Sequence, residues 1–357
     1  MPAIPSFTGL TAVITGASSG MGRELALQLA AEGCHLALCD VRMEDLEKTK
    51  VLVDQISTQQ VKVTTHYCDV SQPASIVAFR EECEEMHPNG WNLLFNNAGI
   101  AGMGPFLDMS KETFDKIFNV SFVGVVECTR QFLPRITQQS VGAVINVSSI
   151  NGFWSALGPA VWPSPSPPHA PYSAAKAAIR GFTDALLHDS YQNFPHISVA
   201  CVHPGHVGTG IARLEYGSEE ESADTIEMMR ERLVRAGVIV SKDKSLQYDS
   251  VELQDMMVEE FKKRAHTTAS GAATIILNGV RNGNTRILVG EDAVVIDWLA
   301  RLFPRWIYND YFFVSVLVPW MMSARALGSP LGRFVYPAVL SLFGYWGVGK
   351  LFRRSKM

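Results

Sequence analysis

Residues 11–22 read TAVITGASSGMG, and this stretch decides the fold class. Its first five residues, Thr11–Thr15, form a short apolar run of the kind found in buried strands. A glycine-rich turn follows, and a helical pattern runs from Arg23 to Glu32. Glycines let the backbone approach a pyrophosphate closely, and a helix N-terminus offers it free N–H groups. The stretch therefore predicts a phosphate-binding strand–turn–helix unit, with an ordinary glycine-rich turn as the alternative.

Strand and helix patterns continue to alternate after this unit. Apolar runs predict further strands at residues 35–39, 61–67, 91–95, 141–147, 197–202 and 285–289. This alternation predicts an α/β protein with a Rossmann-type, doubly wound parallel sheet of about seven strands. Such sheets bind ligands at the carboxyl ends of their strands, where Asp40, Asn96, Ser149 and Pro204 fall. One long helix is predicted over residues 110–139, and Pro134 is expected to kink or end it.

Asp40 gives a prediction about the cofactor. It ends the second predicted strand, about twenty residues after the glycine turn, where a carboxylate accepts hydrogen bonds from ribose hydroxyls. The same carboxylate repels the 2′-phosphate of NADP, so the sequence favours NAD. Arg42 leaves NADP as a possibility, because its guanidinium can pair with that phosphate.

Tyr172 and Lys176 are four residues apart, which places them on one face of a helix. The pKa of a free tyrosine is about 10, and a neighbouring ammonium lowers it by stabilising the phenolate. Such a tyrosine can exchange a proton with an alcohol near physiological pH. Taken alone, this spacing indicates an ordinary pair on a helix surface rather than a catalytic pair. The catalytic interpretation depends on the other motifs of the chain.

Six motifs occur in an order that resembles the short-chain dehydrogenase/reductase family in its standard, non-extended form. They are Thr15-Gly16-x-x-x-Gly20-x-Gly22, Asn96-Asn97-Ala98-Gly99, Asn119, Ser149, Tyr172-x-x-x-Lys176 and Pro204-Gly205-x-Val207-x-Thr209. The glycine spacing differs from the G-x-G-x-x-G of other dinucleotide folds. The resemblance covers about residues 8–209, with a weaker match at 269–290.

The resemblance implies four catalytic residues. Tyr172 is expected to be the general acid/base, and Lys176 to lower its pKa and hold the nicotinamide ribose. Ser149 is expected to donate a hydrogen bond to the substrate oxygen, and Asn119 to order a water in the proton relay. Ser149 is preferred to Ser148 because Ser149-x-x-Gly152 fits the family pattern.

The resemblance also implies the residues that bind NAD or NADP. Asp69 and Val70 follow the third predicted strand, where the adenine ring is expected, and residues 204–209 are expected around the nicotinamide. The full set is Gly16, Ser18, Ser19, Gly20, Met21, Gly22, Asp40, Asp69, Val70, Asn97, Ala98, Gly99, Tyr172, Lys176, Pro204, Gly205, Val207 and Thr209. No cluster of metal ligands is visible in the sequence. His206 is interpreted as a structural turn histidine.

An insertion departs from the family pattern. The family places its tyrosine about thirteen residues after the serine, and here the gap is 23, with the extra residues falling in a proline-rich segment, residues 155–171. Prolines make such a segment stiff and non-helical. It either covers the substrate mouth, with Trp154, Trp162 and His169 reaching the substrate, or is a surface loop that tolerates insertion.

The composition of the chain adds predictions about its binding partners and its cellular compartment. The chain is 47% hydrophobic and 18% charged, which is apolar for a soluble enzyme, and its net charge of −4 gives no reason to expect nucleic acid. Its six cysteines form no C-x-x-C pair and are interpreted as reduced core residues. Reduced cysteines favour a protein that faces a reducing compartment, on the cytoplasmic side. The N-terminal residues show no signal-peptide pattern.

The chain is predicted to divide at residue 290. Residues 1–290 form the catalytic domain, with a substrate lid at about 211–266, and residues 291–357 form an apolar extension. The runs Tyr311–Met322 and Phe334–Val348 are rich in aromatic residues but shorter than the roughly 20 residues of a comfortable span. They favour a monotopic or re-entrant membrane anchor. A buried oligomer interface is the next alternative, and a true span is the least favoured.

The sequence thus predicts an NAD-preferring oxidoreductase for a small lipophilic alcohol or carbonyl compound at a membrane surface. A retinoid, a steroid or a long-chain lipid alcohol fits the apolar extension. The alternatives are an NADPH-dependent carbonyl reductase and a non-catalytic, nucleotide-binding subunit of a membrane complex. A homo-oligomer is plausible on the resemblance.

Overall fold

The computed structural model describes residues 1–302 except 58–59, 103–105, 154–169, 214–222 and 236. The predicted proline-rich insert therefore lies almost wholly outside the described residues. The runs Tyr311–Met322 and Phe334–Val348 lie outside them as well.

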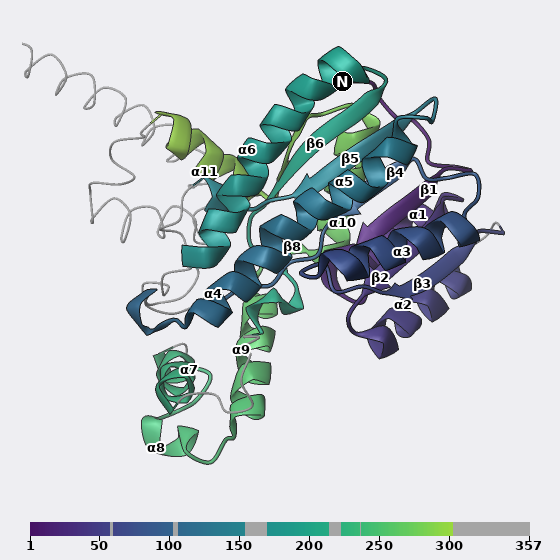
Figure 1. Ribbon diagram of the computed structural model, residues 1–357. Coiled ribbons are helices and arrows are strands. Elements are labelled where there is room, and N and C mark those ends of the chain that lie inside the picture. The colour runs from purple at the N-terminus through teal and green to yellow at the C-terminus, as the bar shows by residue number, and fades with distance from the viewer. Residues whose placement is uncertain (58–59, 103–105, 154–169, 214–222, 236, 303–357) are drawn as a thin grey trace, which may run out of the picture.

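A parallel sheet of seven strands forms the centre of the molecule (Figure 1). Its order is β3-β2-β1-β4-β5-β6-β9, and every neighbouring pair is parallel. The strands are β1 (Thr11–Thr15), β2 (His35–Asp40), β3 (Val63–Tyr67), β4 (Leu93–Asn96), β5 (Gly142–Val147), β6 (Ile197–Pro204) and β9 (Arg286–Val289). The order turns back between β1 and β4, which is where ligands of doubly wound sheets bind. The prediction of a Rossmann-type fold is confirmed.

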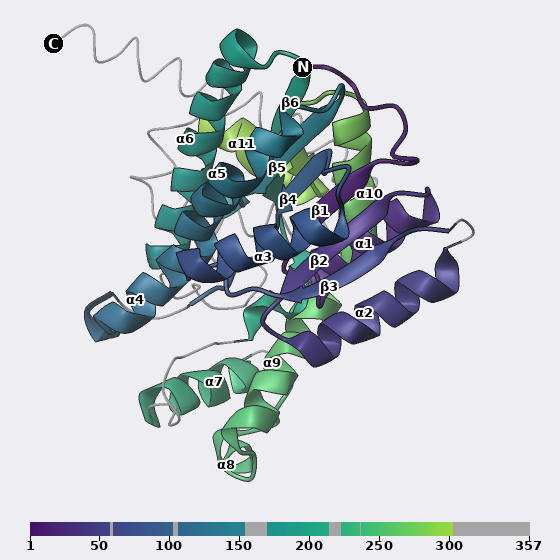
Figure 2. The same ribbon diagram turned by 45° about the vertical axis from the view of Figure 1, so that its right-hand side comes forward.

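Helices cover both faces of the sheet (Figures 1 and 2). One face carries α1 (Gly20–Ala31), α2 (Met43–Ile56) and α10 (Ala269–Arg281). The other carries α3 (Pro73–Met86), α5 (Gly124–Ile136) and α6 (Ala170–Asn193). Because successive strand residues point to opposite faces, Ala12 and Ile14 join the first core and Val13 joins the second.

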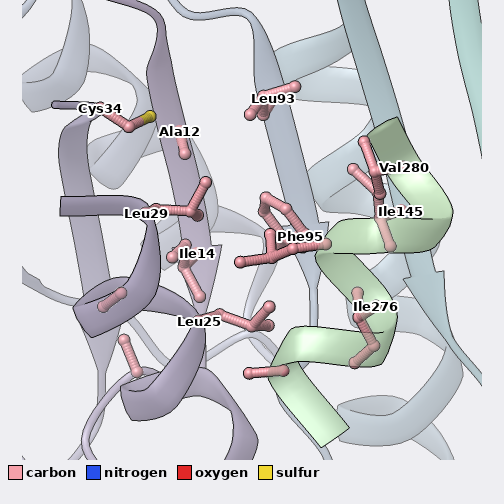
Figure 3. Packing of buried hydrophobic residues seen from close by; sticks show 14 of the residues in the cluster. Ala12, Ile14, Leu25, Leu29, Cys34, Leu93, Phe95, Ile145, Ile276 and Val280 are labelled. Carbon is pink, nitrogen blue, oxygen red and sulfur yellow. The ribbon is translucent and has the colours of Figure 1, made fainter. Parts of the chain in front are cut away.

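Figure 3 shows the first core between α1 and α10. Leu25 and Leu29 of α1 and Ile276 of α10 are fully buried, and Phe95 of β4 lies between the two helices. Complete burial of one such side chain contributes about 1.5–3 kcal/mol. This packing fixes the first turn of α1, and with it the glycine turn, against the sheet.

The predicted long helix is interrupted. α4 (Lys111–Phe118) and α5 are joined by a π-helical turn, Asn119–Val123, and Pro134 lies within the last turn of α5. The apolar pattern runs through the interruption and therefore does not indicate it. π-helical turns often occur at functional sites, and this one begins at the predicted catalytic Asn119.

The predicted lid region contains three helices, α7 (Ala223–Arg235), α8 (Lys242–Ser245) and α9 (Ser250–Arg264). They extend from the main body in Figures 1 and 2, and α7 and α9 share a small apolar core with Met229, Leu233 and Met257. Two short strands were not predicted: β7 (Val207–Gly208) pairs with β8 (Thr267–Thr268). All six cysteines are buried and free. Among the described helices, none combines the length and apolar character needed to cross a membrane.

Candidate active site

A pocket lies at the carboxyl ends of β4, β5 and β6, and α9 closes one side of it. It brings together ten of the predicted site residues, namely Met21, Asn97, Gly99, Ser149, Tyr172, Lys176, Pro204, Gly205, Val207 and Thr209. Ile150, Ile211, Met257 and Phe261 give it apolar walls. Asn119 is not among its lining residues.

Tyr172 and Lys176 stand one turn apart near the start of α6, where Ala174, Ala175, Ala177 and Ala178 favour the helix. Both side chains are buried, and the Lys176 Nζ lies 5.5 Å from the centroid of the Tyr172 ring. Nζ also donates a hydrogen bond of 2.8 Å to the Val147 carbonyl oxygen at the end of β5. This bond aims the ammonium at the sheet edge.

The pKa values of the pair correct one prediction. Burial raises the pKa of Tyr172 to about 12, and a hydrogen bond with the Ser149 side chain acts in the opposite direction. Burial also lowers the pKa of Lys176 to about 8. The sequence predicted a lowered tyrosine pKa, which is wrong for this site as it stands, because the loss of water around Tyr172 outweighs its neighbours.

Ser149 and Ser148 hold different positions. Ser149 caps the short 3₁₀ helix Ile150–Gly152, and its Oγ accepts a hydrogen bond of 3.1 Å from the Asn151 backbone N–H. The Oγ of Ser148 instead donates a hydrogen bond of 2.7 Å to the Lys176 carbonyl oxygen. A Cβ at Gly152 would lie 2.7 Å from that same oxygen. The Ser149-x-x-Gly152 pattern therefore reflects close packing of this turn on α6.

The π-helical turn supports the pocket from behind. Asn119 is its first residue, and its carbonyl oxygen accepts a hydrogen bond from the Gly124 N–H. Ser121, in the same turn, is bonded to both the N–H and the carbonyl oxygen of Ile100. A Cβ at Gly99 would lie 3.3 Å from Lys176 Nζ and 3.7 Å from Ser121 Oγ. The role of Asn119 stays a prediction.

The glycine turn has little free space. Gly16 has φ +67° and Gly20 has φ +54°, in the region that favours glycine. A Cβ at Gly22 would lie 2.1 Å from the Gly16 carbonyl oxygen, and a Cβ at Gly16 would lie 2.8 Å from the Ala98 Cα. Asn97 Nδ2 donates to the carbonyl oxygens of Thr15 and Gly16 at 3.0 and 3.1 Å. Asn97 and Ala98 therefore hold the turn in place.

The N-terminus of α1 fits a pyrophosphate. Ser19 is the N-cap residue, yet its side chain does not cap the helix and accepts a 2.8 Å hydrogen bond from Arg42 instead. Within the described part of the chain, no side chain caps the first N–H groups of α1, and a phosphate-binding helix requires such free groups. Gly20 lies beside Thr209, whose Cβ would be 3.3 Å from a Cβ at position 20.

Asp40 is buried at the end of β2. Its two oxygens accept hydrogen bonds of 3.0 Å from the backbone N–H groups of Ser18 and Arg42. A carboxylate has further lone pairs for ribose hydroxyls, so these bonds are compatible with the predicted role. The Arg42 guanidinium lies 3.7 Å from the Asp40 carboxylate and bonds the hydroxyls of Ser18 and Ser19.

Asp69 and Val70 follow β3 at the same edge of the sheet. The Asp69 carboxylate accepts hydrogen bonds of 2.9 and 2.7 Å from the backbone and hydroxyl of Ser71, and so orders the turn before α3. Val70 is buried, and a Cβ at Gly124 would lie 2.7 Å from its carbonyl oxygen. Neither residue lines the pocket.

Residues 204–209 are predicted to lie around the nicotinamide and are called the nicotinamide loop below. Two contacts that the sequence did not indicate hold this loop. β7 of this loop pairs with β8, and the buried Asp292 carboxylate accepts a hydrogen bond from the His206 backbone N–H. A Cβ at Gly205 would lie 2.2 Å from the Asp292 Oδ1. Burial raises the pKa of Asp292, and hydrogen bonds from the backbone N–H groups of His206 and Ala293 oppose this. The sequence signal was only an acidic residue shortly after the last predicted strand, and its burial is a result of the fold.

His206 is the second residue that sequence reasoning missed. It is interpreted from the sequence as a turn histidine, but the residue is among those that line the pocket, and it is 6% exposed. Its ring packs on Phe261 of α9, with centroids 4.1 Å apart. The residue therefore belongs to the pocket itself.

A sheet of this topology, with these side chains at its carboxyl edge, defines an NAD(P)-type oxidoreductase site. The sequence profile of the family described as short chain dehydrogenase matches residues 10–219. The chain belongs to the short-chain dehydrogenase/reductase family.

Individual relatives extend this similarity. SadH of Mycobacterium tuberculosis is 33% identical over 299 residues, which cover 83% of this chain and 92% of SadH. Oxidoreductase UcpA of Escherichia coli K12 is 33% identical over 205 residues, covering 57% of this chain and 72% of UcpA. A short-chain dehydrogenase/reductase from Burkholderia phymatum, crystallised in complex with NAD, superposes with a TM-score of 0.66 at 26% identity, covering 85% of this chain and 96% of its own.

Proposed function

We propose that this protein is an NAD-dependent oxidoreductase that interconverts a lipophilic alcohol and its carbonyl compound. One observation carries the proposal: Ser149, Tyr172 and Lys176 meet in a buried pocket whose other walls are largely apolar. Polar groups that can handle one oxygen atom thus stand in surroundings suited to a hydrocarbon skeleton.

Each of the three side chains has a different role in the reaction at the substrate oxygen. Ser149 donates a hydrogen bond to that oxygen and holds it beside Tyr172. In reduction the Tyr172 hydroxyl gives its proton to the oxygen, and in oxidation the phenolate takes the proton back. A bound nicotinamide supplies the hydride to the carbonyl carbon or accepts it from the alcohol carbon. Lys176 keeps a positive charge near the phenolate and so lowers its energy.

The proposed preference for NAD depends on the charges around Asp40. Its carboxylate is buried at the end of β2 and would accept bonds from the ribose hydroxyls. The Burkholderia phymatum protein, crystallised with NAD, supports the same cofactor class here. Arg42 lies against the carboxylate and keeps NADPH as the second option.

The membrane surface is the remaining part of the proposal. The described part of α11 (Glu291–Leu302) exposes Val294, Trp298 and Leu302, four residues apart, on one face. An exposed apolar stripe with tryptophan suits the membrane interface. Deleting residues 303–357 should move the protein from the membrane fraction to the soluble fraction. A truncated chain that still sediments with membranes would rule out an anchor in this segment.

A turnover assay tests the proposed NAD-dependent oxidoreductase activity directly. NADH and NADPH oxidation would be followed in parallel with a panel of apolar ketones and aldehydes. The proposal predicts turnover of apolar carbonyl compounds, faster with NADH. Tight binding of NADH without turnover of any panel member would contradict it.

A further inference from the structure

The turn that carries Ser149 ends in a buried aromatic ring. Ser149, Ile150 and Asn151 line the pocket, and Phe153 follows them as the C-cap residue of the short 3₁₀ helix. Two backbone hydrogen bonds close the turn, from the Gly152 N–H to the Ser149 carbonyl oxygen at 3.0 Å and from the Phe153 N–H to the Ile150 carbonyl oxygen at 2.9 Å. The contacts that fix the Phe153 ring therefore also restrain Ser149.

Two side chains from neighbouring strands contact the Phe153 ring. His203 of β6 packs on it, with ring centroids 4.3 Å apart, and is fully buried. The Arg286 guanidinium of β9 lies 4.4 Å from the ring centroid. At that distance the cation is attracted by the π-electrons of the ring, and the attraction is stronger where water is excluded. Because β6 and β9 are paired, both contacts come from one hydrogen-bonded part of the sheet.

α11 holds the Arg286 guanidinium in place. Asp297 of this helix accepts a hydrogen bond from it and is 8% exposed. A charge-assisted hydrogen bond to a buried carboxylate restricts the arginine to a narrow range of positions. Arg301, one turn later on α11, donates to both Asp297 oxygens at 3.0 and 3.1 Å. The helix thus reaches the turn of Ser149 through Asp297, Arg286 and Phe153 in succession.

A second guanidinium near the ring is less well placed. Arg180 of α6 lies 5.8 Å from the Phe153 centroid, against 4.4 Å for Arg286. Arg286 is also the one of the two that is bonded to α11 through Asp297. Arg286 is therefore the residue that connects the helix with the ring.

The contacts to the turn lie on the buried face of α11. Ile296 and Asp297 are buried, whereas Trp298 and Leu302 are exposed. Both β9 and α11 lie beyond residue 219, where the match to the family profile ends. A part of the chain outside the matched segment thus packs on the turn that carries a predicted catalytic residue.

We propose that Arg286 and Asp297 are positioning residues for Ser149, and that α11 is a working part of the active site. This proposal rests on the proposed function and deepens it. Neither residue lines the pocket, so neither takes part in proton or hydride transfer. They hold the Phe153 ring, and with it the turn from which the Ser149 side chain bonds Tyr172.

Hydrogen exchange tests the inference without turnover. Exchange of the backbone amides of residues 148–153 would be followed by mass spectrometry in the full-length protein with NADH present. Arg286→Met keeps the length of the side chain but removes the cation, and Asp297 keeps Arg301 as a partner in this variant. Exchange in residues 148–153 should become about tenfold faster, because the turn opens more often. Exchange in β4 should not change.

Three further variants complete the test. Arg286→Lys returns a cation that can pair with Asp297 and should recover part of the slow exchange. Asp297→Asn removes the charge that holds the guanidinium and should act in the same direction as Arg286→Met. Arg301→Met is the matched control, because Arg301 bonds the same carboxylate but is 60% exposed, and it should leave exchange in residues 148–153 unchanged.

Single-turnover kinetics separates positioning from a merely structural role, because it measures chemistry apart from product release. Displacing a group in an active site by about 1 Å can cost ~10²-fold in rate. Arg286→Met should therefore slow hydride transfer about tenfold or more. The affinity for NADH should stay as in the wild type, and Arg286→Lys should recover part of the rate.

The outcomes separate the two proposals. Unchanged exchange in residues 148–153 of Arg286→Met would overturn the inference, as would faster exchange with an unchanged rate of hydride transfer. Equal effects of Arg286→Met and Arg301→Met would also overturn it. Absence of turnover in the wild type would count against the proposed function, whereas the exchange of residues 148–153 would still show whether Arg286 holds the turn.

Discussion

The Asp292 carboxylate accepts a hydrogen bond from the backbone N–H of His206, 86 residues earlier in the chain. Asp292 opens α11, beyond the segment that the family profile matches, and His206 lies in the nicotinamide loop. The contact is buried, and Gly205 fits only because it has no side chain. The start of the C-terminal extension is thus part of the structure that shapes the pocket.

Replacing Asp292 should loosen the nicotinamide loop. Asp292→Ala removes the acceptor of a buried backbone N–H, which costs about 1–3 kcal/mol in the free energy of unfolding. Asp292→Asn keeps an acceptor oxygen and should cost less. Chemical denaturation measures the unfolding energy, and NADH titration should show weaker binding for the alanine variant. Equal NADH affinity in all three proteins would show that the contact does not shape the cofactor site.

Lys176 should make stability depend on pH. Its pKa is about 8 in the folded protein, below its ordinary value of 10.5, so the folded state releases its proton first. Between about pH 8 and 10 the unfolded state then binds more protons at Lys176, so the contribution of this residue to the free energy of unfolding should rise with pH. Above pH 10 the raised pKa of Tyr172, about 12, acts in the opposite sense.

Lys176→Met isolates this contribution. Denaturation without nucleotide should show a wild type whose free energy of unfolding, relative to Lys176→Met, rises between pH 8 and 10. The buried cysteines, whose pKa values burial raises, lower the stability of both proteins alike in this window. Lys48→Met is a suitable control, because Lys48 is an exposed lysine on α2. A difference in free energy of unfolding between wild type and Lys176→Met that stays constant from pH 8 to 10 would contradict the lowered pKa of Lys176.

Asp40 and Arg42 should act in opposite directions on cofactor choice. Asp40→Ala removes the acceptor for ribose hydroxyls and should lower the NADH-to-NADPH ratio of kcat/KM about tenfold or more. Arg42→Ala removes a guanidinium that a 2′-phosphate can use and should raise the ratio. Kinetics with both cofactors gives the two ratios. If neither substitution changes the ratio, cofactor choice lies elsewhere.

The strands were predictable because burial on both faces requires continuous apolar runs, as in Leu93–Phe95. β6 extends two residues further than predicted, since His203 and Pro204 pair with Leu288 and Val289 of β9. The π-helical turn at Asn119 could not be predicted, because one inserted residue leaves the apolar pattern of a helix almost unchanged. β7 and β8 are two residues each and too short to show a period.

The candidate site was predictable where a motif names the residue type, as for Tyr172 and Lys176. The site was not predictable where the property of a residue depends on its burial in the fold. A sequence shows that a lysine follows a tyrosine by one turn, but not that removal of water raises the pKa of Tyr172. Asp292 and His206 were missed for the same reason, because each is an ordinary surface residue type until the fold buries it.

The central claim is that Tyr172 moves the proton while hydride passes to the substrate in this pocket. General acid/base groups typically contribute about 10²–10⁴-fold to the rate. Tyr172→Phe should therefore lose turnover by such a factor and keep its affinity for NADH. Tyr191→Phe, at an exposed position of the same helix, should behave as the wild type.

The most direct measurement is transfer of deuterium from NADH labelled at the nicotinamide C4 to an apolar ketone, followed by mass spectrometry of the alcohol. NADH labelled on each face of the nicotinamide C4 is needed, because the hydride can leave from either face of the ring. The account predicts a singly deuterated alcohol from one epimer with the wild type and Tyr191→Phe, and almost none with Tyr172→Phe. Equal transfer by Tyr172→Phe, or an alcohol without deuterium from both epimers, would contradict it.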